Sequence, residues 1–507
     1  MKNSFLILAG AVFFAAEVQA SPMQPDLIAR IYFAGAEKIS ADTNSLAFTN
    51  EFCSAEARAL RGQTLDKLSV ALAGWLGQKT GANVPGGAAK LRPLLGDLEK
   101  TSWFLEARVA VDGKPGVALA VKLDGSRAQF WRANLSPFFT SATFKESVGW
   151  LVFDCNEDGQ KIADSLPQKI SAADAGWFNV DLNWPLLAQI FPALAKFDFP
   201  KIRMQATGLN GYFHLNGDFI LSQPLPPLEK WRMPTNTIHA PFDSFTAARG
   251  FAPWLARQSW AQSYEISPPP DQVFIWALPL IPFQTFAAAP VPDAENAFAQ
   301  LGAKLSAVPP TTAPPASPLT PFKLTAVTTN DQIEWRGVPF VSPFAKPLHE
   351  PAGDFLFGGF FPNTPRSKLL PPGFFAQLNR PDLVYYHWEM TGDRLKQLPQ
   401  LTQLALLISQ HRQLAGQSAA DRWLNQIAPS LGNGITEITQ TAPDELAFVR
   451  KAPGGLTAPE FIALANWLEA PDFPGCNLRL PSRPANFKRP VPAQKPGATS
   501  APPFLLH

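Results

Sequence analysis

Residues 102–123 read SWFLEARVAVDGKPGVALAVKL, and this stretch decides the predicted fold of the chain. Polar Glu106 and Arg108 alternate with apolar neighbours, which is the pattern of a strand with one buried face. Residues 112–116 have the composition of a turn, and residues 117–123 return as a second strand. Because so short a connection joins only antiparallel strands, the stretch predicts an antiparallel meander.

The meander is predicted to continue on its C-terminal side, where a turn at 124–125 leads to a third strand at 128–135. Its N-terminal side has helical periodicity instead. Residues 21–100 are predicted to form a helical region, because leucines recur at helical spacing after Thr64, a suitable N-cap. These leucines are Leu65, Leu68, Leu72 and Leu76, followed by Leu91, Leu94, Leu95 and Leu98.

Further along the chain, the order strand, helix, hairpin recurs and predicts three modules. The first completes an α+β domain at 101–222, the second spans 273–381 and the third spans 382–476. Their predicted strands are 178–182, 273–278 and 383–390, their helices 185–196, 294–305 and 393–410 with 419–427, and their hairpins 201–221, 322–340 and 435–450. A proline-rich connection at 223–272, with a helical segment at 242–260, joins the first two modules. Since residue identity between the modules is poor, this is a repeat of element order.

Together these elements predict the α+β class, with antiparallel sheets from meanders and hairpins and with helices packed on one face. The composition agrees, because 46% of the 507 residues are hydrophobic and only 17% are charged. The formal net charge of +2 provides no overall attraction to nucleic acid, so we expect no nucleic-acid partner.

The two ends of the chain differ in composition from the rest. Lys2, the apolar run at 5–16 and Val18-Gln19-Ala20 predict a signal peptide at 1–20, and hence an exported protein, periplasmic or extracellular. Ser21 leaves no cysteine for a lipid anchor, and we expect no transmembrane span after signal removal. The tail at 477–507 is rich in proline, contains bases but no acid, and is predicted to be disordered.

Three cysteines, Cys53, Cys155 and Cys476, are too few and too scattered for a disulfide scaffold. One pair could bridge in an oxidising compartment, and the sequence does not select which.

Residues 154–159 resemble the opening of a calcium loop, with oxygen side chains on Asp154, Asn156 and Asp158 and then a glycine. The twelfth position is Ser165, however, where a calcium loop needs a bidentate carboxylate. The alternative is an acidic turn that caps the following helix. We therefore predict no metal site.

The strand at 383–390 is the second candidate, because alternation places Tyr385, His387 and Glu389 on one face. A phenol, an imidazole and a carboxylate could form a proton relay or half of a metal site. The simpler alternative is the polar face of a half-exposed sheet. Residues 179–183 favour this alternative, since Asn179 and Asp181 alternate there in the same way.

No nucleotide, zinc-protease or nucleophile-elbow motif is present, so no catalytic residue and no cofactor is predicted. The leading hypothesis is an exported, non-catalytic binding or interaction protein of the bacterial cell envelope, with an envelope component or an apolar ligand such as a lipid as its partner. The rival hypothesis is a secreted hydrolase whose active-site residues are dispersed along the chain.

Overall fold

The computed structural model describes residues 26–475, except 82–83, 110–112, 114, 140–141, 148, 155–156, 174–175, 196–198, 258–268, 280–283, 307–324, 330, 338–341, 362–367, 370–371, 377 and 398–417. The predicted signal peptide and the C-terminal tail therefore lie outside the described residues. Among the described residues, no helix is long and apolar enough to cross a membrane.

The first part of the chain contains strands β1 (Leu27–Phe33), β2 (Trp103–Val109), β3 (Pro115–Lys122), β4 (Thr143–Ser147), β5 (Trp150–Asp154), β6 (Phe178–Asn183), β7 (Lys201–Leu209) and β8 (Tyr212–Ile220). The second part contains β10 (Ser244–Arg249), β11 (Gln272–Leu278), β12 (Gln284–Val291), β13 (Thr325–Thr328), β14 (Ile333–Arg336), β15 (Phe344–Glu350), β16 (Gly353–Gly359), β18 (Leu383–Met390), β19 (Asn433–Ala442) and β20 (Glu445–Ala452). A separate small sheet pairs β9 (His239–Ala240) with β17 (Lys368–Leu369).

The helices are α2 (Ala36–Ala41), α3 (Leu46–Phe52), α4 (Ala55–Thr80), α5 (Gly87–Lys100), α6 (Gly125–Leu135), α7 (Glu157–Ala173), α8 (Trp184–Ile190), α9 (Ala252–Arg257), α11 (Ala294–Ser306), α12 (Pro372–Ala376), α13 (Thr391–Lys396), α15 (Ala419–Ile427) and α16 (Ala458–Glu469). Two short 3-10 helices, η1 (Thr43–Ser45) and η2 (Pro192–Leu194), complete the described elements.

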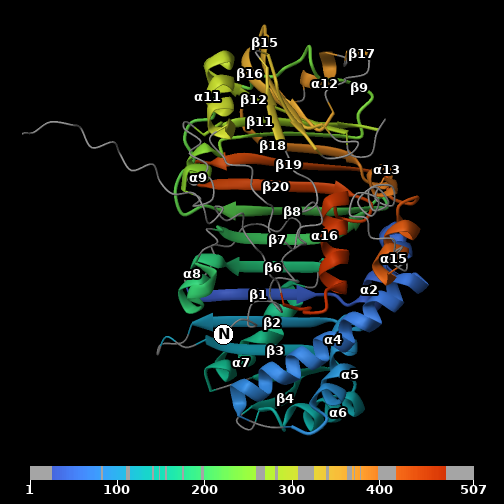
Figure 1. Cartoon of the computed structure of the whole chain (residues 1–507). Coiled ribbons are helices and arrows are strands. Elements are labelled where there is room, and N and C mark those ends of the chain that lie inside the picture. The colour runs from blue at the N-terminus through green and yellow to red at the C-terminus, as the bar shows by residue number, and fades with distance from the viewer. Residues whose placement is uncertain are drawn as a thin grey trace, which may run out of the picture.

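In the described part of the chain, eighteen strands form one continuous antiparallel sheet (Figure 1), which confirms the predicted α+β class. The pairings give the order β4-β5-β3-β2-β1-β6-β7-β8-β20-β19-β18-β10-β11-β12-β16-β15-β14-β13. The predicted meander of β2 and β3 is present, and so are the hairpins β7–β8 and β19–β20.

The sheet consists of two halves with the same topology. Outward from the central β8–β20 pair, the first half runs β8-β7-β6-β1-β2-β3-β5-β4. The second half runs β20-β19-β18-β10-β11-β12-β16-β15 and then adds the hairpin of β14 and β13. Strands at matching places also follow the same chain order in both halves. The molecule is therefore an internal duplication at the level of topology.

The duplication corrects the predicted set of three modules. The first and third have the expected order, as β6, α8, β7–β8 and as β18, α13 and α15, β19–β20. In the second, strand β12 lies between β11 and helix α11, so the order there is wrong. β11 and β12 instead form a hairpin that matches β2 and β3 of the first half.

Three local predictions are also wrong. Residues 27–33 form strand β1 instead of part of a helical region, and residues 244–249 form strand β10 instead of a helix. Strand β1 has buried residues on both faces, which removes the polar alternation that marks a strand, whereas β10 alternates between buried and partly buried residues from Phe245 to Arg249. Residues 125–135 form helix α6 instead of a strand, because the Asp124 carboxylate accepts a hydrogen bond from the Arg127 amide and caps a helix there.

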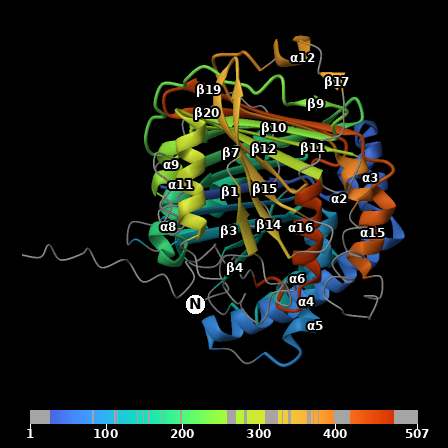
Figure 2. The same cartoon turned by 45° about the horizontal axis from the view of Figure 1, so that its top comes forward.

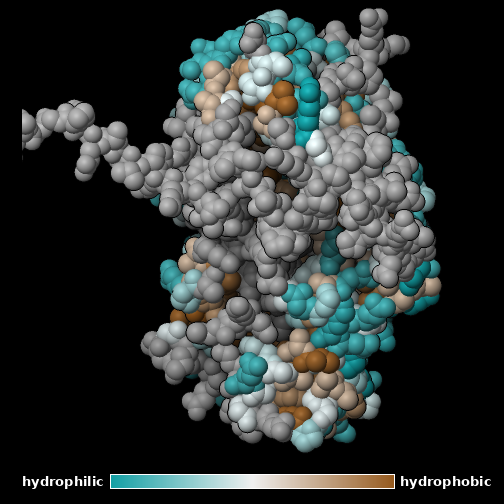
Figure 3. Space-filling model, in the orientation of Figure 1, coloured by the Kyte–Doolittle hydropathy of each residue, from teal (hydrophilic) through white to brown (hydrophobic). Residues whose placement is uncertain are grey.

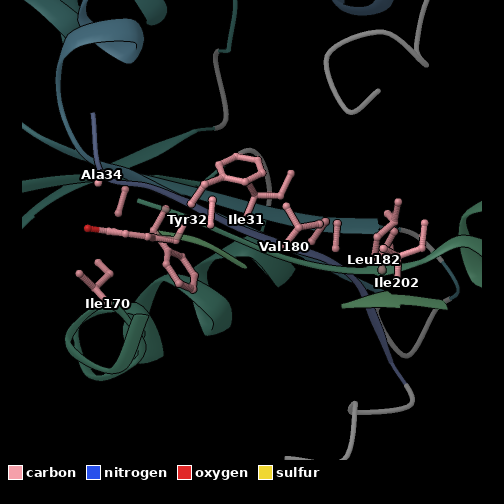
Figure 4. Close-up of a cluster of buried hydrophobic side chains, with 14 of the residues drawn as sticks. Ile31, Tyr32, Ala34, Ile170, Val180, Leu182 and Ile202 are labelled. Atoms are coloured by element: carbon pink, nitrogen blue, oxygen red, sulfur yellow. The ribbon is translucent and has the colours of Figure 1, made fainter. Parts of the chain in front are cut away.

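The two faces of the sheet are named here by two neighbouring residues of β1. The Ile31 face carries Val180 of β6. The paired residues that start at Val180 and run across β7, β8, β20 and β19 end at Tyr385 of β18, so Tyr385 lies on the same face. The Tyr32 face carries Phe104 of β2 and is covered by α7, whose Ile170 lies beside Tyr32 (Figure 4).

Most other helices lie over the Ile31 face or at its margins. Helices α4, α5 and α6 share a core with Val121, Leu151 and Phe153 of that face. In Figures 1 and 2, α8, α9 and α11 stand along one end of the strands, and α15 and α16 stand along the other. The Tyr32 face of the second half carries an aromatic core that includes Phe245, Trp276 and Phe286. On the surface in Figure 3, hydrophilic side chains gather over α4 and α16.

Candidate functional site

Polar side chains from β10, β18 and α13 converge on the Ile31 face of the second half. We call this group the polar cluster, and its members are Asp243, Ser244, Thr246, His387, Glu389, Thr391 and Arg394. The Glu389 side chain is 1% exposed and the His387 side chain 12% exposed. The cluster thus contains two of the three candidate residues of the 383–390 strand.

Thr246, His387 and Glu389 stand in line across two neighbouring strands. Thr246 and His387 are paired directly between β10 and β18, and Thr246 Oγ1 is 2.8 Å from His387 Nδ1. On the other side of the ring, His387 Nε2 is 3.4 Å from Glu389 Oε2. A hydroxyl, an imidazole and a carboxylate therefore follow one another in contact.

Glu389 also connects the sheet to two helices. Its Oε1 accepts hydrogen bonds from the Thr391 hydroxyl at 2.7 Å and from the Ala458 amide, in the first turn of α16, at 2.6 Å. Burial raises the pKa of this carboxyl, but His387, Thr391 and the Ala458 amide more than offset it and hold the pKa below its ordinary value. Glu389 is therefore an ionised carboxylate at neutral pH.

A second carboxylate and one guanidinium complete the charges of the cluster. The Arg394 guanidinium lies 3.6 Å from Glu389 Oε2 and 3.4 Å from Asp243 Oδ1, and it also contacts the Ser244 hydroxyl. Burial raises the pKa of Asp243, and Arg394 and the Gln397 amide offset part of that rise. Two acids thus share one arginine beside an imidazole.

Tyr385, the third residue of the candidate strand face, lies next to the cluster without bonding to it. Its ring stacks on the His387 ring with centroids 6.4 Å apart. Burial raises the pKa of its phenol to about 12, so Tyr385 is a neutral hydroxyl at physiological pH. Beyond it, Arg450 donates to Thr436 and forms a two-bonded ion pair with Glu460 of α16.

The first half of the molecule shows what this fold contains at the same positions. The residues that precede α8 and α13, Asn183 and Met390, are equivalent, and the pairing of β6 with β1 matches that of β18 with β10. The positions of Ser244, Thr246, His387, Glu389, Thr391 and Arg394 correspond to Ala29, Ile31, Val180, Leu182, Trp184 and Leu187. All six of these first-half residues are apolar and buried.

The polar cluster is therefore no requirement of the fold. Burying polar and charged groups costs free energy unless each is paired, and at the six corresponding positions the first half avoids that cost with apolar residues. The second half keeps the charged groups on the same backbone frame. Such a cost without a structural need is typical of a functional site.

This comparison overturns the sequence argument for a plain polar face. Asn179 and Asp181 alternate as His387 and Glu389 do, but they lie on the Tyr32 face, where Asp181 pairs in register with Arg30 and Arg203. On the Ile31 face, the paired residues that start at His387 and run across β19, β20, β8 and β7 end on β6 at the apolar residue Phe178. Alternation gives the spacing of a face but not its identity, because register decides which face is which.

The acidic turn at 154–159 has a structural role at its first residue. Asp154 is 3% exposed, and its carboxylate accepts hydrogen bonds from the amide and the hydroxyl of Thr143 on β4. Asn156 lies outside the described residues, as does the side chain of Asp158, and helix α7 begins at Glu157. Across the described part of the chain, no group of three or more potential metal ligands is found.

The cysteine question is answered for one residue. Cys53 is a free thiol next to the Ser40 hydroxyl, 3.9 Å away. Cys155 and Cys476 lie outside the described residues.

Sequence reasoning missed Thr246, Asp243, Ser244 and Arg394. Thr246 is 141 residues from its partner His387 and stood in a segment predicted to be helical. No local pattern links the two residues, and only the pairing of β10 with β18 brings them together. For Arg394, the signal in the sequence was that an acid and an arginine follow Met390. This composition is equally typical of an ordinary helix surface.

With the fold and the cluster described, the chain was compared with known proteins. No family model, curated protein or solved structure matches it. The class of the protein is therefore defined by its own architecture, a duplicated α+β sheet that has eighteen strands in the described residues and carries the polar cluster on one face.

Proposed function

We propose that the protein is an exported binding protein of the bacterial cell envelope and that its ligand is amphipathic and lipid-like. The observation that carries the proposal is the contact between the polar cluster and an apolar strip on the same face of the sheet. Export itself is supported by the signal-peptide pattern at 1–20.

The apolar strip begins one strand away from Thr246. Ile275 of β11 is paired in register with Thr246 and is 37% exposed, although it is a large aliphatic residue in a central strand. Ile275 is paired with Ala287 on β12, and Ala287 is half-buried. Ala287 is in turn paired with Gly358 on β16. Adjacent strands are about 4.8 Å apart, so the distance between the polar cluster and the apolar strip is within the size of a lipid head group.

A single continuous sheet is a suitable frame for such a site. The polar cluster and the apolar strip lie on neighbouring, hydrogen-bonded strands of one sheet, so their relative position is rigid. Ligand sites in proteins combine an apolar surface with a few convergent polar groups, and the Ile31 face of the second half has both.

The proposal is tested by native mass spectrometry of the full protein recovered from its own host without detergent, followed by solvent extraction. We expect a bound amphipathic molecule in the native protein and its loss in Ile275→Arg, because a charge there opposes an apolar chain. Val70→Arg is the matched control, since Val70 is an exposed aliphatic residue on the distant helix α4. A ligand-free native protein, or equal loss in both variants, would contradict the proposal.

A further inference from the structure

The line of Thr246, His387 and Glu389 has the composition of a nucleophile, a base and an orienting acid. Hydroxyl–imidazole–carboxylate arrays with this connectivity activate the hydroxyl for attack on carbonyl groups. The contact from hydroxyl to ring is 2.8 Å, and the contact from ring to carboxylate is 3.4 Å. Catalytic hydrogen bonds are often long before substrate binds.

The partners of the imidazole decide where its proton lies. His387 Nε2 and Glu389 Oε2 make no hydrogen bond in this structure, but the charge of the ionised carboxylate 3.4 Å away favours the tautomer with its proton on Nε2. Nδ1 is then the acceptor that faces the Thr246 hydroxyl. The ring is thus in the tautomer that a general base requires.

The site is also reachable from one side. Thr246 and His387 are each only partly buried, and the neighbour of Thr246 on β11 is the exposed Ile275. Glu389, by contrast, is buried and fixed by Thr391 and by the Ala458 amide. The acid is held in place, whereas Thr246 and His387 stay partly exposed.

We propose that this array is an acyl-transfer site in which Thr246 is the nucleophile, His387 the general base and Glu389 the positioning residue, and that its substrates are carboxylic esters. Thr246 Oγ1 bonds to the ester carbonyl carbon while its proton passes to His387 Nδ1. The ester C–O bond then breaks, and the alcohol leaves with that proton. Water gives a proton to His387 and adds to the acyl carbon, the bond from that carbon to Thr246 Oγ1 breaks, and Oγ1 takes the proton back from His387 as the carboxylic acid is released.

The molecule contains a natural comparison for this assignment. Thr207 and His214 are also paired in register, on β7 and β8 of the first half, and both are partly buried. The next residue across from His214 is Lys451 instead of an acid. Burial and this lysine lower the pKa of His214, so no carboxylate orients that imidazole. Thr207 should therefore be unreactive.

The test uses the full chain with a fluorophosphonate, which transfers its phosphonyl group to the oxygen of an activated hydroxyl with loss of fluoride. Peptide mapping by mass spectrometry should place the adduct on Thr246 and not on Thr207. We expect labelling to fall at least about 100-fold in His387→Gln, to be abolished in Thr246→Val and to persist in Thr246→Ser.

Thermal melting of each variant separates a lost nucleophile from a lost fold, and Thr207→Val should label as the native protein does. The proposal is overturned by a folded native protein with no adduct on Thr246, or by labelling that His387→Gln leaves unchanged. Ligand occupancy, measured on the same samples, reports on the binding function independently of this outcome.

Discussion

At the scale of single residues, Glu51 shows how a buried acid makes stability depend on pH. It lies in α3, is 1% exposed and approaches Gly454 in the second half, where an added Cβ would be 2.6 Å from its Oε2. Burial raises its pKa from 4.5 to about 8, and neither of its carboxyl oxygens has a hydrogen-bond partner among the described residues. Glu51 is therefore protonated in the folded protein at neutral pH.

We predict that Glu51→Gln stabilises the protein. Above pH 4.5 the unfolded chain ionises Glu51 while the folded protein keeps it neutral, so stability falls as the pH rises from 4.5 to about 8. At pH 7 this loss amounts to about 3 kcal/mol, which the amide avoids. Urea unfolding at pH 7 should show the gain, and unfolding at pH 4 should not. Glu37→Gln on the exposed side of α2 is the control and should change little at either pH.

A surface histidine provides a second prediction of pH dependence. His349 is 2.9 Å from Asp354 and 3.4 Å from Glu295 of α11, and hydrogen bonds with these two acids raise its pKa above 6.5. The stabilising contribution is complete at pH values below 6.5 and disappears as the pH rises through the raised pKa. Titration of the His349 ring by NMR should show a lower pKa in Glu295→Gln than in the native protein. An unchanged titration curve would mean that Glu295 makes no such contact in solution.

At the scale of elements, Glu389 and Arg394 join β18, α13 and α16. Removing one member of a buried ion pair leaves a buried charge, so we predict that Glu389→Leu and Arg394→Leu each cost about 3–5 kcal/mol of stability. These substitutions introduce the first-half counterparts of the two positions, Leu182 and Leu187. The double variant should therefore lose clearly less than the sum of the single losses.

Chemical denaturation of the four proteins measures that coupling directly. Asp393 and Lys396 form an exposed ion pair on the same helix and serve as the control, where single losses should be small and additive. Additive losses at Glu389 and Arg394 as well would mean that the two side chains do not act as a pair.

At the scale of the whole molecule, the β8–β20 pair joins two halves of the same topology into one sheet. Gly217 lies in β8 at this junction, and a Cβ there would be 2.2 Å from the carbonyl oxygen of Arg203 on β7. We predict that Gly217→Ala costs about 2–4 kcal/mol, because the backbone of β7 must move away.

Calorimetry should show that loss as a lower melting temperature. Gly62→Ala is the matched control, since an added Cβ in the middle of α4 meets nothing within 4 Å. It should instead stabilise the protein by up to about 1 kcal/mol through helix propensity. Equal effects of the two substitutions would show that β7 and β8 are not tightly packed at Gly217.

The fold class was predictable because it depends on local patterns. Alternation at β2 and β3, the turns of the hairpins and the helix caps each lie within about ten residues of chain. Strand β1 was missed because burial on both faces removes alternation, whereas β10 was missed although its burial alternates from Phe245 to Arg249. The order of the strands and the twofold repeat of topology were not predictable, since the two halves share almost no residue pattern.

The candidate site was likewise predictable from the sequence only in part. His387 and Glu389 were found because they are two residues apart on one strand, whereas Thr246 and Arg394 needed the pairing of β10 with β18 and the return of α13 onto the sheet. The comparison with the first half shows that the polar cluster is unusual. That comparison also required the register of every strand between the two halves.

The sequence by itself determined the antiparallel α+β class, the hairpins and the alternation that places Tyr385, His387 and Glu389 together. Periodicity encodes these features, because side chains on a strand alternate between faces whatever the strand packs against. Only the tertiary structure decided which face that is, which strands are neighbours and that His387 meets Thr246. Cross-strand pairs contribute little free energy each and are similar among many alternatives, so the pairing of distant strands is selected by the sum of the whole sheet.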